Sequence, residues 1–123
     1  FRAAAEHGQP DAMYHLGLLA AADDDYDGAR DWYRQAAEHG RVDAINNLAA
    51  LCHRHGDLTE AAALYLRAIE ADDTDSQPMF NLGVLHHSQG RPDEAAEWWR
   101  RAAALGNDAA AQKLALLDEE NGD

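Results

Sequence analysis

The chain has 123 residues, which is the size of one ordinary domain and enough to bury a continuous core without disulfides or metals. Its net charge of −13, from 23 acidic and 10 basic residues, disfavours nucleic acid and an anionic membrane surface as partners. The single cysteine, Cys52, cannot form an internal disulfide, and no apolar run approaches the roughly 20 residues of a membrane span, so we expect a cytoplasmic protein.

The sequence repeats itself at a period of about 32 residues. The segments Phe1–Gly8 (FRAAAEHG) and Tyr33–Gly40 (YRQAAEHG) are nearly the same. The same shift, with a short insertion near Asp72–Asp75, relates four marker leucines, which are Leu16, Leu48, Leu82 and Leu114. A repeat of this length predicts stacked supersecondary units that bury a shared core.

Apolar residues three and four positions apart predict two amphipathic helices in each repeat, joined by short turns. After the end of a helix at Phe1–His7, the first helices of the repeats are expected at Asp11–Ala21, Asp43–Arg54, Gln77–Ser88 and Asp108–Leu117. The second helices are expected at Tyr26–His39, Leu58–Ala71 and Pro92–Leu105. Pro10 and Pro92 suit a first helical turn, and glycines stand where helices should end, at Gly8, Gly40, Gly56, Gly90 and Gly106.

The second helices share a pattern of small and aromatic residues. Each carries an alanine, then an aromatic residue, then a second alanine: Ala29, Tyr33 and Ala36, then Ala61, Tyr65 and Ala68, then Ala95, Trp99 and Ala102. The alanines allow paired helices to approach closely, and the ring fills the space towards the next pair. The pattern predicts an all-α solenoid of antiparallel helix pairs.

This run of leucine, small residue, alanine, aromatic and alanine resembles the tetratricopeptide repeat over essentially the whole chain. The segment Trp32–Gly40 is similar to the Sel-one-like subclass, in which a glycine ends the second helix. The longer glycine-containing turn of that subclass is absent, and the proline of standard tetratricopeptide repeats is replaced by Arg41, Asp73 and Asn107, so the subclass stays open.

The resemblance implies a right-handed α-solenoid of about three full repeats plus flanking helices, in one domain spanning residues 1–123. The chain opens inside a second helix and ends in the polar segment Asp118–Asp123, so we expect a C-terminal fragment of a longer protein. Its many alanines and arginines are typical of a GC-rich bacterial gene.

In this family the first helices line the concave side of the superhelix, which implies a binding groove. The groove residues are Tyr14, His15, Asn46, Asn47, His53, Arg54, Phe80, Asn81, His87, Gln112 and Lys113. Their amides can bond the backbone of an extended peptide, and their aromatic rings can contact its side chains, although simple solvation explains an exposed asparagine equally well.

We therefore predict a non-enzymatic protein–protein interaction module that binds a peptide or protein segment in this groove. The alternative is a structural scaffold that self-associates through its open N-terminal face or through an apolar edge at Trp98–Trp99.

One subset of the family binds the C-terminal carboxylate of heat-shock chaperones through lysine, asparagine and arginine side chains. In this chain only Asn47 matches that set, whereas Tyr14, Leu18, Gln77 and Asn81 occupy the other positions. Without cations the charge-assisted bonds to the carboxylate are lost, so a chaperone tail is not the expected partner.

Metal ions and cofactors are not expected. Cys52-His53 with His55, and His86-His87, have spacings that can hold zinc, but Cys52 and His86 stand at equivalent positions predicted to be in the core. Asp23, Asp25, Asp27 and Gly28 fit the opening of a calcium loop, yet Arg34 takes the twelfth position, and Asp25 suits a helix N-cap better. No phosphate-binding glycine loop or nucleophile elbow is present in the sequence.

Overall fold

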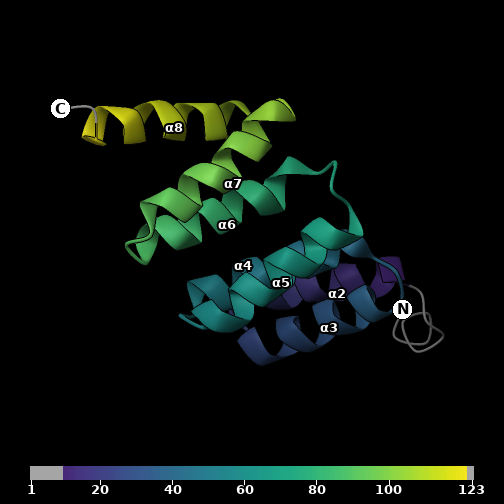
Figure 1. Cartoon of the computed structure of the whole chain (residues 1–123). Helices are drawn as coiled ribbons and strands as arrows, with labels where there is room; N and C mark the ends of the chain where they lie inside the picture. Colours follow the sequence, from purple (N-terminus) through teal and green to yellow (C-terminus); the bar gives the residue numbers. More distant parts are fainter. Residues whose placement is uncertain (1–9, 122–123) are drawn as a thin grey trace. The chain divides into compact units, whose positions relative to one another are not determined.

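In the computed structural model, residues 10–121 are described, and they form seven helices and no strand (Figure 1). The helices are α2 (Pro10–Ala22), α3 (Tyr26–Glu38), α4 (Val42–Arg54), α5 (Leu58–Ala71), α6 (Ser76–Ser88), α7 (Pro92–Ala104) and α8 (Asp108–Asn121). The all-α prediction is confirmed. The predicted helix end at Phe1–His7, together with Gly8, lies outside the described residues.

The predicted helix bounds agree with the observed ones to within one residue, except at the end of α8. That helix was expected to stop at Leu117 but continues to Asn121. The reason is local: no glycine or proline interrupts the chain before Gly122, and glutamate is a good helix former.

Contacts divide the chain into two compact units, and the division falls inside α5, between Leu64 and Tyr65. In unit 1, α3 packs against both α2 and α4. In unit 2, α7 packs in the same way against α6 and α8. In each unit, α3 or α7 therefore lies between two first helices, as an antiparallel helix-pair solenoid requires.

The core of each unit is built on an aromatic ring that packs directly against a glycine of the neighbouring helix. Tyr33 and Trp99 are 3% and 2% exposed. A Cβ atom added to Gly17 would lie 2.6 Å from the Tyr33 ring, and one added to Gly83 would lie 2.3 Å from Trp99 Nε1. The small and aromatic pattern of the sequence thus lies in the core, as predicted.

The turns after α2, α3, α4, α6 and α7 use a left-handed residue to end the helix. Gly40, Gly56, Gly90 and Gly106 all have positive φ, and the residue after each donates its N–H to a carbonyl of the last helical turn. The turn after α2 has the same hydrogen bonds, with Asp25 N donating to Ala20 O at 2.8 Å, but the left-handed position is Asp24, with φ of 59°. Among the five described turns with a left-handed residue, only this one uses a residue other than glycine.

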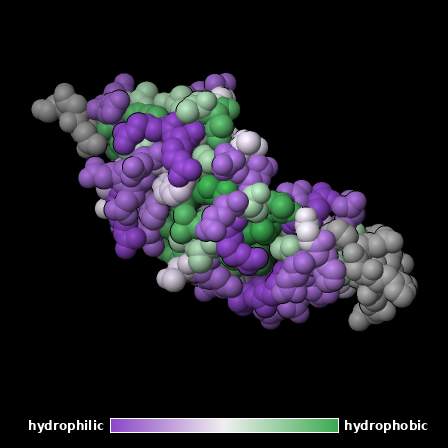
Figure 2. All heavy atoms as spheres, turned by 45° about the vertical axis from the view of Figure 1, so that its right-hand side comes forward, coloured by the Kyte–Doolittle hydropathy of each residue, from purple (hydrophilic) through white to green (hydrophobic). Residues whose placement is uncertain are grey.

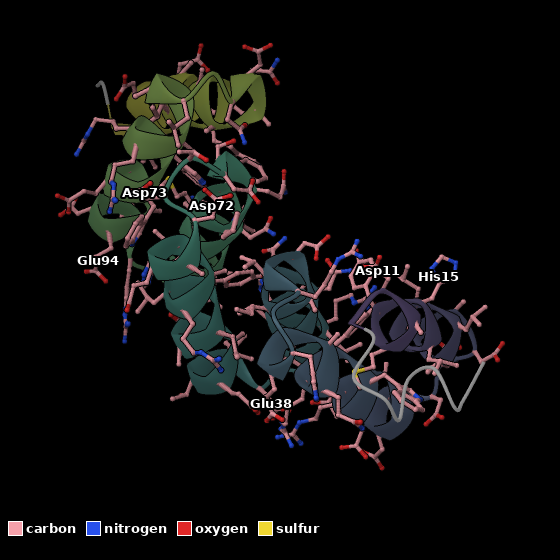
Figure 3. All side chains as sticks on the ribbon, turned by 90° about the vertical axis from the view of Figure 1, so that its right-hand side faces the viewer. Asp11, His15, Glu38, Asp72, Asp73 and Glu94 are labelled. Carbon is pink, nitrogen blue, oxygen red and sulfur yellow. The ribbon has the colours of Figure 1, made fainter. Side chains whose placement is uncertain are left out.

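The inserted residues form the loop between α5 and α6, where Asp72 and Asp73 are seen (Figure 3). Asp72 accepts a hydrogen bond from the backbone N–H of Thr74 at 3.0 Å, and Asp75 accepts one from Gln77 N at the start of α6. The insertion is therefore a capped turn, which leaves the helical repeat on either side unchanged.

Replacing Gly83 by Ala should destabilise the fold by about 1–3 kcal/mol, because the new methyl group must displace the Trp99 indole from its packed position. The double variant Gly83→Ala/Trp99→Phe should recover part of that loss, since the smaller ring lacks the atom nearest the methyl. Urea unfolding followed by far-UV circular dichroism measures both values. Equal losses in the single and double variants would contradict the contact as the cause.

Replacing Asp24 by Gly should stabilise unit 1 by about 0.5–1 kcal/mol, because glycine adopts positive φ without the steric cost of a Cβ atom. Asp24→Asn is the matched control, since it removes the charge but keeps the Cβ atom. A gain in Asp24→Asn as large as that in Asp24→Gly would assign the effect to charge. The reverse change, Gly90→Asp, should be destabilising by a similar amount in the same urea experiment.

Candidate functional site

The first helices of unit 1 present a surface that we call the unit 1 surface. It contains Tyr14, His15 and Leu18 from α2, and Asn46, Asn47, Ala50, His53 and Arg54 from α4. Residues three or four positions apart on a helix lie on one side of it, so α2 and α4 each contribute one stripe. His15 and Arg54 are exposed, and Tyr14, Asn46, Asn47 and His53 are half-buried.

Hydrogen bonding and stacking hold Tyr14 in place. Asn47 Nδ2 donates to the Tyr14 hydroxyl at 2.9 Å, and the Arg41 guanidinium lies over the ring at 4.3 Å from its centroid. Arg41 is itself fixed by ion pairs with Asp11 and Asp43, which raise its pKa. Sequence reasoning placed Tyr14 and Asn47 on one surface but did not find Arg41, whose role depends on a cation–π contact that spacing cannot reveal.

Asp11 and His15 project from the same side of α2 into solvent (Figure 3). Towards the end of α4, the positive charge of Arg54 acts on buried Tyr33. Burial raises the pKa of Tyr33, whereas the Asn47 hydrogen bond and the Arg54 charge lower it. Arg54 itself is exposed at the end of α4.

The unit 2 surface consists of Gln77, Phe80, Asn81, Val84 and His87 from α6, and Gln112, Lys113 and Leu116 from α8. Gln77 Nε2 donates to Asn81 Oδ1 at 3.1 Å, and the Phe80 carbonyl accepts from Trp99 Nε1 at 3.2 Å. Phe80 is half-buried and Gln112 is exposed. The bond from Trp99 fixes the middle of α6 to the core of the unit, and the bond between Gln77 and Asn81 lies within α6.

Two of the predicted groove residues meet in a small pocket in unit 2. The pocket has a volume of about 70 Å³ and is lined by His87, Trp99, Lys113, Leu116 and Leu117. The His87 and Trp99 rings are tilted, with centroids 5.7 Å apart. No described carboxylate forms an ion pair with Lys113. Lys113 therefore offers its ammonium group to a ligand at the mouth of an apolar pocket.

An apolar position on each first helix escaped the sequence prediction. It is the second residue after each marker leucine: Leu18, Ala50, Val84 and Leu116. Leu18 is 40% exposed and Leu116 is 55% exposed, while Ala50 and Val84 are half-buried. Figure 2 shows hydrophobic atoms at the surface between hydrophilic ones. The fixed two-residue offset in the sequence was the signal that could have found these positions.

Family models decide the relationship of the chain to known proteins. Two models described as tetratricopeptide repeat match it, one over residues 41–108 and the other over residues 1–44. The chain belongs to the tetratricopeptide repeat family. Both models carry the general description, so the Sel-one-like subclass stays a prediction. No curated protein matches the sequence.

Solved tetratricopeptide structures have the same fold at low sequence identity. The Arabidopsis OM64 TPR domain has a TM-score of 0.80 at 21% identity, and the match covers 90% of this chain and 95% of that one. The N-terminal domain of stress-induced protein-1 from C. elegans has a TM-score of 0.79 at 21% identity, covering 89% and 94%. The first TPR of Spaghetti (RPAP3), bound to the HSP90 peptide SRMEEVD, has a TM-score of 0.80 at 16% identity, covering 93% and 94%. These likenesses confirm the solenoid fold, and family membership supports a protein-interaction module.

The apolar edge predicted at Trp98–Trp99 of this tetratricopeptide chain is wrong. Trp99 is 2% exposed and hydrogen-bonded, so it belongs to the core. Trp98 is half-buried, and the Arg101 guanidinium lies 4.5 Å from its ring centroid. Neighbouring residues on a helix point about 100° apart, so only one of two adjacent tryptophans faces the neighbouring helix. The other self-association site, the N-terminal face, lies outside the described residues.

The residues considered as metal ligands on sequence grounds have other surroundings in the structure. Cys52 is fully buried, and burial raises the pKa of its thiol. Asp25 Oδ1 accepts from Gly28 N at 3.0 Å, which confirms Asp25 as the N-cap of α3. His86 Nδ1 lies 3.8 Å from Glu94 Oε2, with no hydrogen-bond partner. Within residues 10–121, no three histidine, cysteine or acidic side chains come together as metal ligands.

None of the helices described for this chain is both long enough and apolar enough to cross a bilayer.

Burial lowers the pKa of His86 below its ordinary 6.5; Glu94 opposes this effect and Arg91 adds to it. Because the folded state favours the neutral imidazole, its stabilising contribution is present above pH 6.5 and is lost as the pH falls further. His86→Cys, which installs the residue of the equivalent position 52, should reduce the fall in unfolding free energy between about pH 8 and about pH 5.

The measurement is a series of urea titrations at several pH values, with His15→Cys as the control at an exposed histidine. Only the pH dependence is compared, so a constant loss of stability in a variant does not matter. The same pH dependence in His86→Cys and in the wild type would refute the assignment.

Proposed function

We propose that this chain is a protein-interaction module that binds extended polypeptide segments on the first-helix surface of each of its two units. The observation that carries the proposal is the pair of exposed leucines, Leu18 and Leu116, at equivalent positions of α2 and α8. Each stands among side chains that donate and accept hydrogen bonds. An extended peptide needs this combination, because its backbone is polar and its alternate side chains are buried on binding.

In unit 1, the amide of Asn47 is orientated by its bond to Tyr14, and this bond uses one of its N–H groups. The carbonyl oxygen of that amide is then the group that accepts a hydrogen bond from a peptide N–H. Leu18 lies one turn from Tyr14 on α2, which puts an apolar contact beside the polar one.

In unit 2, Lys113 donates from the rim of the pocket that Leu116, Leu117 and Trp99 line. This arrangement suits an apolar side chain of the ligand with a peptide carbonyl or a carboxylate next to it. A carboxylate gains most, because a charge-assisted bond is about twice as strong as a neutral one.

The peptide-bound Spaghetti (RPAP3) domain supports peptide binding by this fold. We propose a different peptide for this chain, because the residues expected for a chaperone-tail clamp are absent. Gln77 and Asn81 stand at two of those positions. Their amide side chains are neutral, so neither brings a positive charge to a carboxylate, and they are hydrogen-bonded to each other.

Peptides selected by the wild-type chain from a random display library test the proposal. Leu18→Asn should raise the Kd of a selected peptide that binds unit 1 by about tenfold, and Leu116→Asn should do the same for a peptide that binds unit 2. The reason is that burying a leucine contributes about 1.5–3 kcal/mol and each leucine is already part-covered. Calorimetric titration measures these constants.

The matched controls are Leu66→Asn in α5 and Leu105→Asn at the C-cap of α7, which change leucines that are 42% and 45% exposed and lie outside the first helices. They should leave Kd within about twofold. If both pairs of variants weaken binding equally, or if the library yields no peptide, the first-helix surfaces are not the binding site.

A further inference from the structure

Unit 1 contains a second pocket, which has a volume of about 220 Å³ and lies beside the end of α4. Its lining residues are Ala21, Asp24, Tyr26, Leu51, Arg54 and His55. They come from the end of α2, the turn after it, the start of α3 and the end of α4. Sites for drug-sized ligands have volumes of about 300–1,000 Å³, so the occupant of this pocket is a smaller molecule.

The uncharged part of the lining is rigid. Tyr26 and His55 stack with ring centroids 3.7 Å apart and an interplanar angle of 11°. The Tyr26 hydroxyl donates to Asp57 Oδ2 at 2.8 Å, and this bond is the main reason that the pKa of Tyr26 is raised. Together with Ala21 and Leu51, the stacked pair forms an apolar and aromatic wall that is held in place before any ligand binds.

The lining also carries two opposite charges, those of Asp24 and Arg54. They do not form a salt bridge with each other, and neither forms one with another described residue. Neighbouring Asp25 is already used as the N-cap of α3, and Asp57 accepts from Tyr26. The pocket therefore offers one carboxylate and one guanidinium, apart from each other, to a ligand.

The backbone at Asp24 adds a second argument. Four turns of the same kind place glycine at the left-handed position, whereas the turn beside the pocket places Asp24 there. An aspartate in this conformation costs free energy relative to glycine, and such strain is concentrated at functional sites. Turn formation alone does not require an aspartate at position 24, whereas a pocket that binds a cationic group does.

We propose that this pocket binds a free α-amino acid with an apolar side chain. The ligand ammonium pairs with Asp24, its carboxylate pairs with Arg54, and its side chain packs against Ala21, Leu51 and the stacked rings. Charge-assisted bonds at both ends and an apolar wall between them match the three parts of such a molecule. The pocket shares Arg54 with the unit 1 surface, but the proposal does not rest on peptide binding there.

Calorimetric titration with L-leucine and L-phenylalanine as probes tests the proposal on the whole chain. At least one should bind saturably, and Asp24→Gly and Arg54→Gln should each weaken it by about tenfold or more. Asp23→Asn and Arg67→Gln remove exposed charges outside the lining and should leave Kd unchanged. Asp24→Gly is expected to be at least as stable as the wild type, so its loss of binding cannot come from unfolding.

Ligand analogues assign each charge to its partner. Isocaproate lacks the ammonium group of leucine, so its weaker binding should depend on Arg54 and not on Asp24; isoamylamine lacks the carboxylate and should show the reverse. N-acetyl-leucine amide has neither charge, stands for a residue inside a peptide, and should not bind. The proposal is overturned if neither amino acid binds, if binding survives both pocket variants, or if the uncharged amide binds as well as leucine.

Discussion

The close packing of an aromatic ring on a glycine is the constraint on which the rest of each unit depends. Tyr33 meets Gly17 in unit 1, and Trp99 meets Gly83 in unit 2, at distances that leave no room for a Cβ atom. A ring in this place fixes both the separation of the two helices and their rotation about their own axes. Rotation decides which residues of a first helix face away from the core, and so it decides which residues can meet a ligand.

This constraint explains why most of the fold is predictable from the sequence. The marker leucines, the alanines and the aromatic residues recur at a fixed shift, so one correct alignment places every helix. Helix ends follow from glycine and proline, whose backbone preferences are local. The end of α8 was missed because no such residue stands at Leu117, and the sequence after it was interpreted as a polar end segment.

The candidate binding surface was less predictable than the fold, because it depends on which side chains hydrogen-bond or stack with each other. Spacing puts Tyr14 and Asn47 on first helices, but it does not show that they bond each other or that Arg41 covers the Tyr14 ring. Trp98 and Trp99 were read as one patch although adjacent helical positions diverge. Leu18 and Leu116 were missed as contact residues because the predicted groove set holds only polar, charged and aromatic side chains, although exposed leucines are common on protein surfaces.

The positions of the acidic residues explain how a strongly negative chain can have binding surfaces without carboxylates. Several acids stabilise the fold itself: Asp25 and Asp75 cap helices, Glu60 accepts two hydrogen bonds from Arg30, and Asp11 and Asp43 fix Arg41. The predicted groove residues include Arg54, Lys113 and three histidines but no carboxylate. The acids therefore lie outside the predicted groove positions, and the net charge of the chain is a poor guide to what the first-helix surfaces bind.

The turn at Asp24 connects stability with binding in unit 1. Every requirement of the turn is met by glycine, which the equivalent turns use, so the aspartate lowers stability without improving the backbone hydrogen bonds. A repeat protein tolerates this cost because each repeat is stabilised by its neighbours, and α3 packs on both α2 and α4. The same carboxylate stands in a pocket opposite Arg54, where a fixed charge has the most effect on a small ligand. Asp24 therefore departs from the glycine of the equivalent turns at the position where the proposed ligand needs a carboxylate.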